Sequence, residues 1–115
     1  MSSRGDRAFL EDIQEAIRRT HLYVDGISYE QFLIDLKTQD ALIRTLEIIG
    51  EAAKRLSPEI RERHSAIPWK SMAGLRDKLI HHYFGVNFDI VWQIVQDELP
   101  TVSVVVERLL SSDLQ

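Results

Sequence analysis

Apolar positions along this chain recur mostly at spacings of three and four residues, the period of an amphipathic α-helix. The clearest stripe predicts a helix from about Asp40 to Leu56, and a broad apolar arc predicts another from Trp69 to Phe84. Weaker stripes predict further helices over about 6–23 and 101–110, one starting at Asn87 or Asp89, and short ones over about 28–33 and 58–64. We therefore expect an all-α fold, an up-and-down helical bundle of four main helices plus one or two short helices.

Capping and breaking residues support these bounds. Asp6 can cap the first helix, and Ser28 with Gln31 fits a capping box. Pro68 stands directly before the Trp69 helix, where proline starts helices well. Pro100 is expected to break the last helical stretch in two.

Composition indicates one folded, soluble domain spanning residues 1–115. The chain is 44% hydrophobic and 28% charged, which suits a packed core. It contains no cysteine, which excludes disulfides, thiolate metal sites and cysteine nucleophiles. The N-terminus lacks a signal-peptide pattern, and no apolar run approaches the ~18 residues of a membrane helix. We expect a cytoplasmic protein with no membrane partner.

The net charge of −4 is distributed unevenly along the chain. Residues 1–53 carry 6 basic and 10 acidic side chains, and residues 83–115 carry 1 basic and 5 acidic. Residues 54–82 carry 7 basic and 3 acidic side chains, which gives this segment an excess of +4. Such an excess is typical either of a local anion site, for example for phosphate, or of a solvated helix face.

Arg76 is the main anomaly of the Trp69–Phe84 helix. On a helical wheel it lies in the middle of the apolar arc, where a charge is costly unless it is paired or faces a cleft. Asp77 and His81 stand at the edge of the arc as an i,i+4 pair within hydrogen-bonding reach. Tyr83 lies about 20° from Arg76, two turns along. One groove could therefore collect all four side chains.

These residue types suit phosphodiester cleavage without a metal. A histidine with an ordinary pKa of ~6.5 can accept or donate a proton near neutral pH. Arg76 can grip a phosphate bidentately and stabilise transition-state charge, while Asp77 orients the imidazole of His81. RNA transesterification uses two acid–base groups, and a two-fold dimer would supply the second histidine.

Simpler interpretations of the same residues exist. A lone histidine at a helix end is more often a surface or structural group, and Tyr83 on an apolar face is most simply a core residue. Glu47 and Glu51 resemble a paired carboxylate for metal or acid–base work. Because flanking arginines give each a partner and no second helix offers a matching Glu-x-x-His, we favour ion pairs.

Two sequence blocks carry a family resemblance. Residues 76–83 read Arg-Asp-Lys-Leu-Ile-His-His-Tyr and match the Arg-x4-His-x-Tyr pattern of the HepT-type HEPN toxins. Residues 46–56 resemble the other characteristic helix of that family, and residues 67–75 resemble its approach to the motif. The likeness covers about residues 5–110, nearly the whole chain.

The resemblance implies a homodimeric HEPN fold and a metal-independent ribonuclease. Arg76 and His81 would be its catalytic residues at the dimer cleft, with Asp77 in support and no cofactor. The protein would be the toxin of a toxin–antitoxin pair, neutralised when a minimal nucleotidyltransferase antitoxin transfers AMP to Tyr83. Asp77 departs from the asparagine common at its position and adds a negative charge near an anionic substrate.

Two other functions stay open at this point. The chain could be a non-catalytic HEPN subunit that binds nucleotide or substrate for a partner nucleotidyltransferase. It could also be a structural bundle in which Arg76 forms a salt bridge at an interface.

Overall fold

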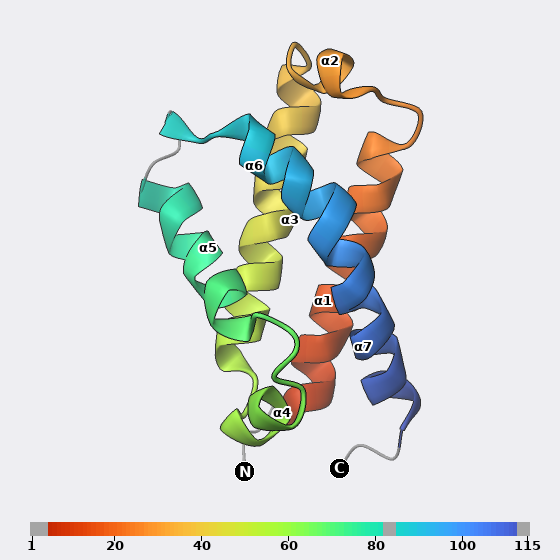
Figure 1. The fold of residues 1–115 in the computed structure, drawn as a ribbon, viewed down its shortest axis with the longest axis vertical. Coiled ribbons are helices and arrows are strands. Elements are labelled where there is room, and N and C mark those ends of the chain that lie inside the picture. The colour runs from red at the N-terminus through yellow and green to blue at the C-terminus, as the bar shows by residue number, and fades with distance from the viewer. Residues whose placement is uncertain (1–4, 82–84, 113–115) are drawn as a thin grey trace.

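The computed structural model describes residues 5–81 and 85–112, with the backbone alone at Arg76, Lys78, Ile80 and His81. It confirms the all-α fold, since no strand occurs in either described range (Figure 1). The helices are α1 (Gly5–Val24), α2 (Tyr29–Phe32), α3 (Leu36–Arg55), α4 (Pro58–Arg63), α5 (Trp69–His81), α6 (Phe88–Gln93), the π-helical segment η2 (Ile94–Glu98) and α7 (Leu99–Ser111).

The central helix of the bundle is α3. Helices α1 and α5 pack along it, α7 packs against α1, and α6 and η2 lead into α7 across the bundle (Figure 1). The short α4 lies at one end of the molecule, between the end of α3 and the start of α5. None of the helices in the described ranges is long and apolar enough to cross a membrane.

Helix α3 begins four residues earlier than the apolar stripe predicts. Asp35 caps it, because its carboxylate accepts hydrogen bonds from the Thr38 N–H (3.1 Å) and hydroxyl (2.7 Å). The Thr38 hydroxyl bond is the main cause that lowers the pKa of the Asp35 carboxyl. Leu36 is 73% exposed and did not fit the stripe, so the predicted start at Asp40 was wrong.

Asp6 is not the cap of α1. The helix already includes Gly5, which has a φ of +72°, and the Asp6 carboxylate points to a distant part of the chain. It accepts hydrogen bonds from the Ser57 N–H (2.8 Å) and hydroxyl (2.7 Å). Ser57 in turn caps α4 by accepting from the Ile60 N–H. Asp6 therefore fastens the start of α1 to the α3–α4 junction, a tertiary role that local pattern does not show.

Pro100 does not break the helix. Helices α6, η2 and α7 follow one another without a gap, so the predicted break and the start at Thr101 were wrong. Proline lacks an N–H and clashes with the preceding turn of a regular α-helix. The π segment widens that turn, and the Leu99 N–H donates to the Ile94 carbonyl five residues back. The wider turn accommodates Pro100 near the start of α7.

Other sequence expectations are confirmed. The capping box of Ser28 and Gln31 forms, α4 begins at Pro58, and α5 begins directly after Pro68. Asn87 caps α6 by accepting from the Asp89 and Ile90 N–H groups. The predicted end of the motif helix at Phe84 falls outside the described residues.

Polar and aromatic contacts fix the packing of the bundle at specific points. Between α1 and α3, the buried Thr20 hydroxyl lies 2.8 Å from the Thr45 hydroxyl. At the α2 end, the Phe32 ring lies 5.0 Å from Trp92 and 5.7 Å from Phe88. These contacts hold α2 and α6 together over the end of the bundle.

The Asp6–Ser57 contact generates a stability prediction. Asp6→Ala should lower the free energy of unfolding by about 1.5–3 kcal/mol, because two hydrogen bonds to a charged, partly buried acceptor are lost. Urea denaturation measures this change. Gln14→Ala, at an exposed position of the same helix, is the control and should change stability by less than about 0.5 kcal/mol. Equal stability of the two variants would show that the contact contributes nothing.

Candidate functional site

The candidate site lies on α5, which buries one face against α3. Trp69, Met72 and Leu79 are its buried anchors, at most 7% exposed. The Trp69 indole N–H also donates to the His64 carbonyl (3.0 Å), which fixes the first turn of α5 against the α4–α5 connection. The register of α5 is therefore set by its own apolar side chains.

This register places the position of Arg76 between two buried side chains of α5. On the wheel its position lies between Trp69, at about +20°, and Met72, at about −40°. The sequence prediction of an arginine position within the apolar arc thus agrees with the observed burial of its neighbours. The side chain of Arg76 is outside the described residues.

The other predicted site residues lie elsewhere on the helix or beyond it. Asp77 is exposed, at about +100° from Arg76, and the position of His81 follows at about +140° on the helical wheel. The predicted Asp77–His81 hydrogen bond involves a side chain outside the described part of the chain and stays a prediction. Tyr83 lies outside it altogether.

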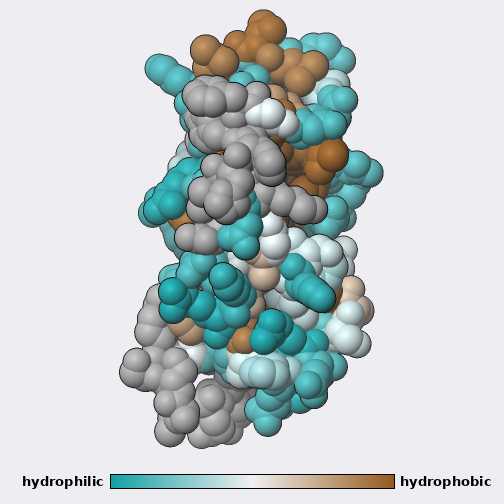
Figure 2. All heavy atoms as spheres, turned by 90° about the vertical axis from the view of Figure 1, so that its left-hand side faces the viewer, coloured by the Kyte–Doolittle hydropathy of each residue, from teal (hydrophilic) through white to brown (hydrophobic). Residues whose placement is uncertain are grey.

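A cavity that the sequence did not indicate adjoins α5. It has a volume of about 220 Å³ and lies between α3, α5 and the α6–η2–α7 helix. Its floor is apolar, and Ser71 and Glu98 are the polar residues of its wall. Figure 2 looks onto the α5 side of the molecule, where apolar surface gathers at the upper end and along one edge of a largely hydrophilic face.

The carboxylates of α3 form ion pairs. Glu51 lies 2.7 Å from Arg55 and Glu47 lies 3.7 Å from Arg44, which confirms the ion-pair interpretation of this stripe. Within residues 5–81 and 85–112, no three histidine or carboxylate side chains gather as a metal site would require.

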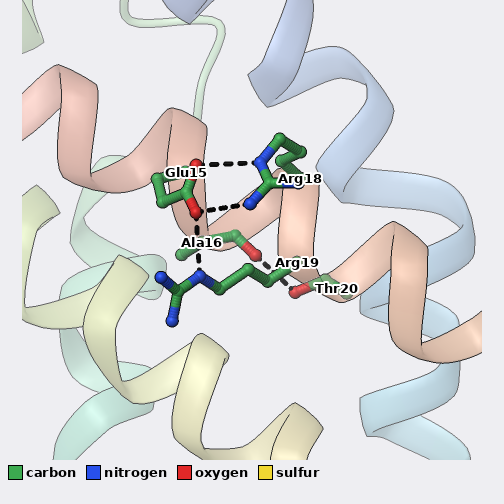
Figure 3. Close-up of polar contacts among 5 residues, drawn as sticks. All are labelled: Glu15, Ala16, Arg18, Arg19 and Thr20. Carbon is green, nitrogen blue, oxygen red and sulfur yellow. Dashed lines mark hydrogen bonds and ion pairs between the residues drawn. The ribbon is translucent and has the colours of Figure 1, made fainter.

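A second charged cluster lies on α1 and was not anticipated from the sequence. Glu15 accepts two hydrogen bonds from Arg18 (2.9 and 2.7 Å) and one from Arg19 (2.8 Å) (Figure 3). The Arg18 hydrogen bonds, followed by that of Arg19, lower the pKa of Glu15 to about 2. The Glu15 carboxylate thus binds both arginines. Because it already occupies their donors, this pair of arginines is a weaker site for an external anion than two free arginines would be.

The Glu15 cluster generates a titration prediction. NMR titration of the Glu15 carboxyl carbon should give a midpoint near 2, and Arg18→Gln should move it toward the ordinary 4.5. Because the folded-state pKa is lowered, the ionised carboxylate favours the folded chain above pH 4.5, and this contribution disappears as the pH falls toward 2. Lys37→Gln, on α3, should leave the midpoint unchanged. An ordinary midpoint in the parent would mean that the cluster does not persist in solution.

Comparison with known proteins identifies the family. The family model described as "Ribonuclease HepT-like" matches residues 13–109. A relative named "Putative RNase MJ0127", from Methanocaldococcus jannaschii, is 44% identical over 96% of this chain and 91% of its own length. "Putative RNase TTE0752" from Caldanaerobacter subterraneus is 46% identical over 93% and 96%. "Probable ribonuclease HepT" from Thermococcus cleftensis is 45% identical over 92% and 96%.

The family match over residues 13–109 covers α2 to α6 and η2 in full and most of α1 and α7. The chain belongs to the HepT-like ribonuclease family, which confirms the resemblance that the motif indicated. A search of solved structures gives no significant match.

Proposed function

We propose that this protein is a metal-independent RNA endonuclease and the toxin of a HEPN toxin–antitoxin pair. The observation that carries the proposal is the family match over residues 13–109, which includes the Arg-x4-His-x-Tyr motif at residues 76–83. The relatives' names specify ribonucleases. On the helical wheel the position of Arg76 falls between the buried Trp69 and Met72, which supports an arginine close to the body of the bundle.

The chemistry is transesterification within the RNA strand. The 2′ oxygen attacks the adjacent phosphorus while the bond from phosphorus to the 5′ oxygen breaks, which leaves a 2′,3′-cyclic phosphate and a 5′ hydroxyl. His81 takes the proton from the 2′ hydroxyl, and His81 of the partner subunit gives a proton to the 5′ oxygen. Arg76 binds the non-bridging oxygens and stabilises the charge that builds on them.

This division of labour requires a homodimer with two-fold symmetry. Each chain supplies one motif histidine, and a two-fold axis near α5 would place two such helices at one cleft. A guanidinium at an apolar position is costly unless it is paired or reaches a cleft, and a two-fold seam beside α5 would offer such a cleft at its edge. Asp77, which is exposed one residue further on, would orient the imidazole of His81.

RNA cleavage tests the catalytic assignment. Purified protein with unmodified Tyr83 should cleave RNA in excess EDTA. His81→Ala should lower the rate by about 10²–10⁴-fold and Arg76→Ala by about 10²–10³-fold, because a proton carrier or a charge-stabilising donor is lost. His21→Ala, an exposed histidine of α1, is the matched control and should retain full activity.

Other outcomes have distinct meanings. Cleavage that persists in both motif variants would place the activity elsewhere. If the parent fails to cleave RNA while intact mass shows an unmodified Tyr83, the ribonuclease proposal is wrong, and tight nucleotide binding would then favour a non-catalytic HEPN subunit.

The toxin would be silenced by a minimal nucleotidyltransferase that modifies Tyr83. The tyrosine oxygen attacks the α-phosphorus of ATP, pyrophosphate leaves, and the phenolic proton passes to a base or to solvent. Tyr83 lies about 20° from Arg76 on an extended helical wheel, so the attached AMP would bring negative charge to the phosphate site.

Mass spectrometry tests this modification. Incubation with the nucleotidyltransferase and Mg-ATP should add the mass of one AMP per chain and abolish RNA cleavage. Tyr83→Phe should remain unmodified and active under the same conditions, whereas the control Tyr23→Phe should be modified and inhibited like the parent. Modification of Tyr83→Phe would contradict the assignment.

A further inference from the structure

A groove of about 620 Å³ lies between α4 and the first turn of α5, away from the motif. Its polar residues are Arg61, Glu62, Ser65 and Lys70, set among prolines and the edges of two buried side chains. The groove lies within the segment 54–82 that carries the basic excess of the chain.

The floor of the groove is held in shape by its own packing and hydrogen bonds. Ile67 and Trp69 are at most 3% exposed. The His64 carbonyl accepts hydrogen bonds from the Ile67 N–H (3.1 Å) and the Trp69 indole N–H (3.0 Å). The α4–α5 connection is therefore a preorganised part of the surface, so a ligand would meet a formed groove.

Arg61 is not among the arginines that pair with a carboxylate of their own helix. Most arginines with described side chains pair with a carboxylate on their own helix: Arg7, Arg18, Arg19, Arg44 and Arg55. Arg61 has no acidic residue three or four positions away. Its Nε is buried and has no hydrogen-bond partner among the residues the structure describes. Because this Nε is buried, only the terminal nitrogens of the Arg61 guanidinium can reach an anion in the groove, where Arg61 is one of the lining residues.

Lys70 is a second cation at the groove, and its position on α5 relates the groove to the motif. It is exposed, and no acidic residue lies three or four positions from it. Lys70 and His81 are eleven residues apart on α5, so their positions lie within about 20° of one another and roughly 16 Å apart along the helix. On the helical wheel the position of Lys70, and with it the groove, therefore faces nearly the same side of α5 as the position of His81.

We propose that this groove binds backbone phosphates of the RNA strand, a few nucleotides away from the scissile bond. The proposal rests on the ribonuclease function above and assigns part of its substrate binding. Arg61 and Lys70 contact phosphate oxygens, and the Ser65 hydroxyl can donate to one as well. Glu62 at the same groove opposes the anion and limits affinity.

RNA binding measured by fluorescence anisotropy at several salt concentrations tests the groove. Lys70→Gln and Arg61→Gln should each weaken the binding of an RNA of about twelve nucleotides by about three- to fivefold and reduce the salt slope by about 0.7. Glu62→Gln should strengthen binding. Lys37→Gln on α3 and Glu59→Gln on α4 are the matched controls and should bind like the parent.

Kinetics separate this site from the motif. At saturating RNA the groove variants should cleave at the parent kcat with a raised KM, whereas His81→Ala loses kcat. Dinucleotide substrates, too short to reach the groove, should not distinguish parent from groove variants.

Each contrary outcome has its own meaning. Groove variants that bind the longer RNA like the parent would overturn the groove while leaving the ribonuclease function intact. An equal loss in Lys37→Gln would indicate a diffuse electrostatic effect instead and would also overturn it. If the parent neither binds nor cleaves RNA, both proposals fail.

Discussion

The burial of α3 is the constraint on which the rest of the structure depends. Its buried residues cover about half of its circumference, wide enough to face α1 on one side and α5 on the other. Thr45 meets Thr20 of α1, while Leu46 shares a cavity wall with Met72 of α5. Any rotation of α3 would expose apolar side chains toward one neighbour and bury charged ones toward the other. The orientation of the motif helix is thereby coupled to that of α1, although the two helices lie on opposite sides of α3 (Figure 1).

The sequence predicts most of the helices because their stability comes from amphipathic burial, and burial leaves a periodic pattern. It fails where a helix end depends on a contact outside that pattern. Asp6 has the chemistry of a cap, yet its partner is Ser57, which lies 51 residues away. At Asp35 the capping signal precedes the first buried residue, so a stripe alone places the start too late. Pro100 would break a regular α-helix, but the π turn before it leaves room for the proline ring, so the helix continues.

For the candidate site, sequence shows which residues can do chemistry, and structure shows which surfaces lie near them. The motif is visible in sequence because its spacing and its apolar surroundings are local properties of one helix. The groove at Arg61 is not, since its floor is made by the fold of the α4–α5 connection around the His64 carbonyl. The sequence shows that no acidic residue lies three or four positions from Arg61. It does not show that the side chain of Arg61 is partly buried.

The π segment has a consequence for how the C-terminal helix fits the bundle. The buried positions of α6, η2 and α7 are Val91, Val95, Leu99, Val102, Val106 and Leu109. Their spacings are four, four, three, four and three residues. The two consecutive spacings of four, from Val91 to Val95 and from Val95 to Leu99, span η2. In a regular helix such a pair advances the apolar stripe around the axis, and the wider π turn compensates for this drift. Gln96, Asp97 and Glu98, which lie between the buried positions, are exposed. The extra residue of the π turn therefore lies on the solvent side of the helix, and the buried side chains form one continuous stripe against the core.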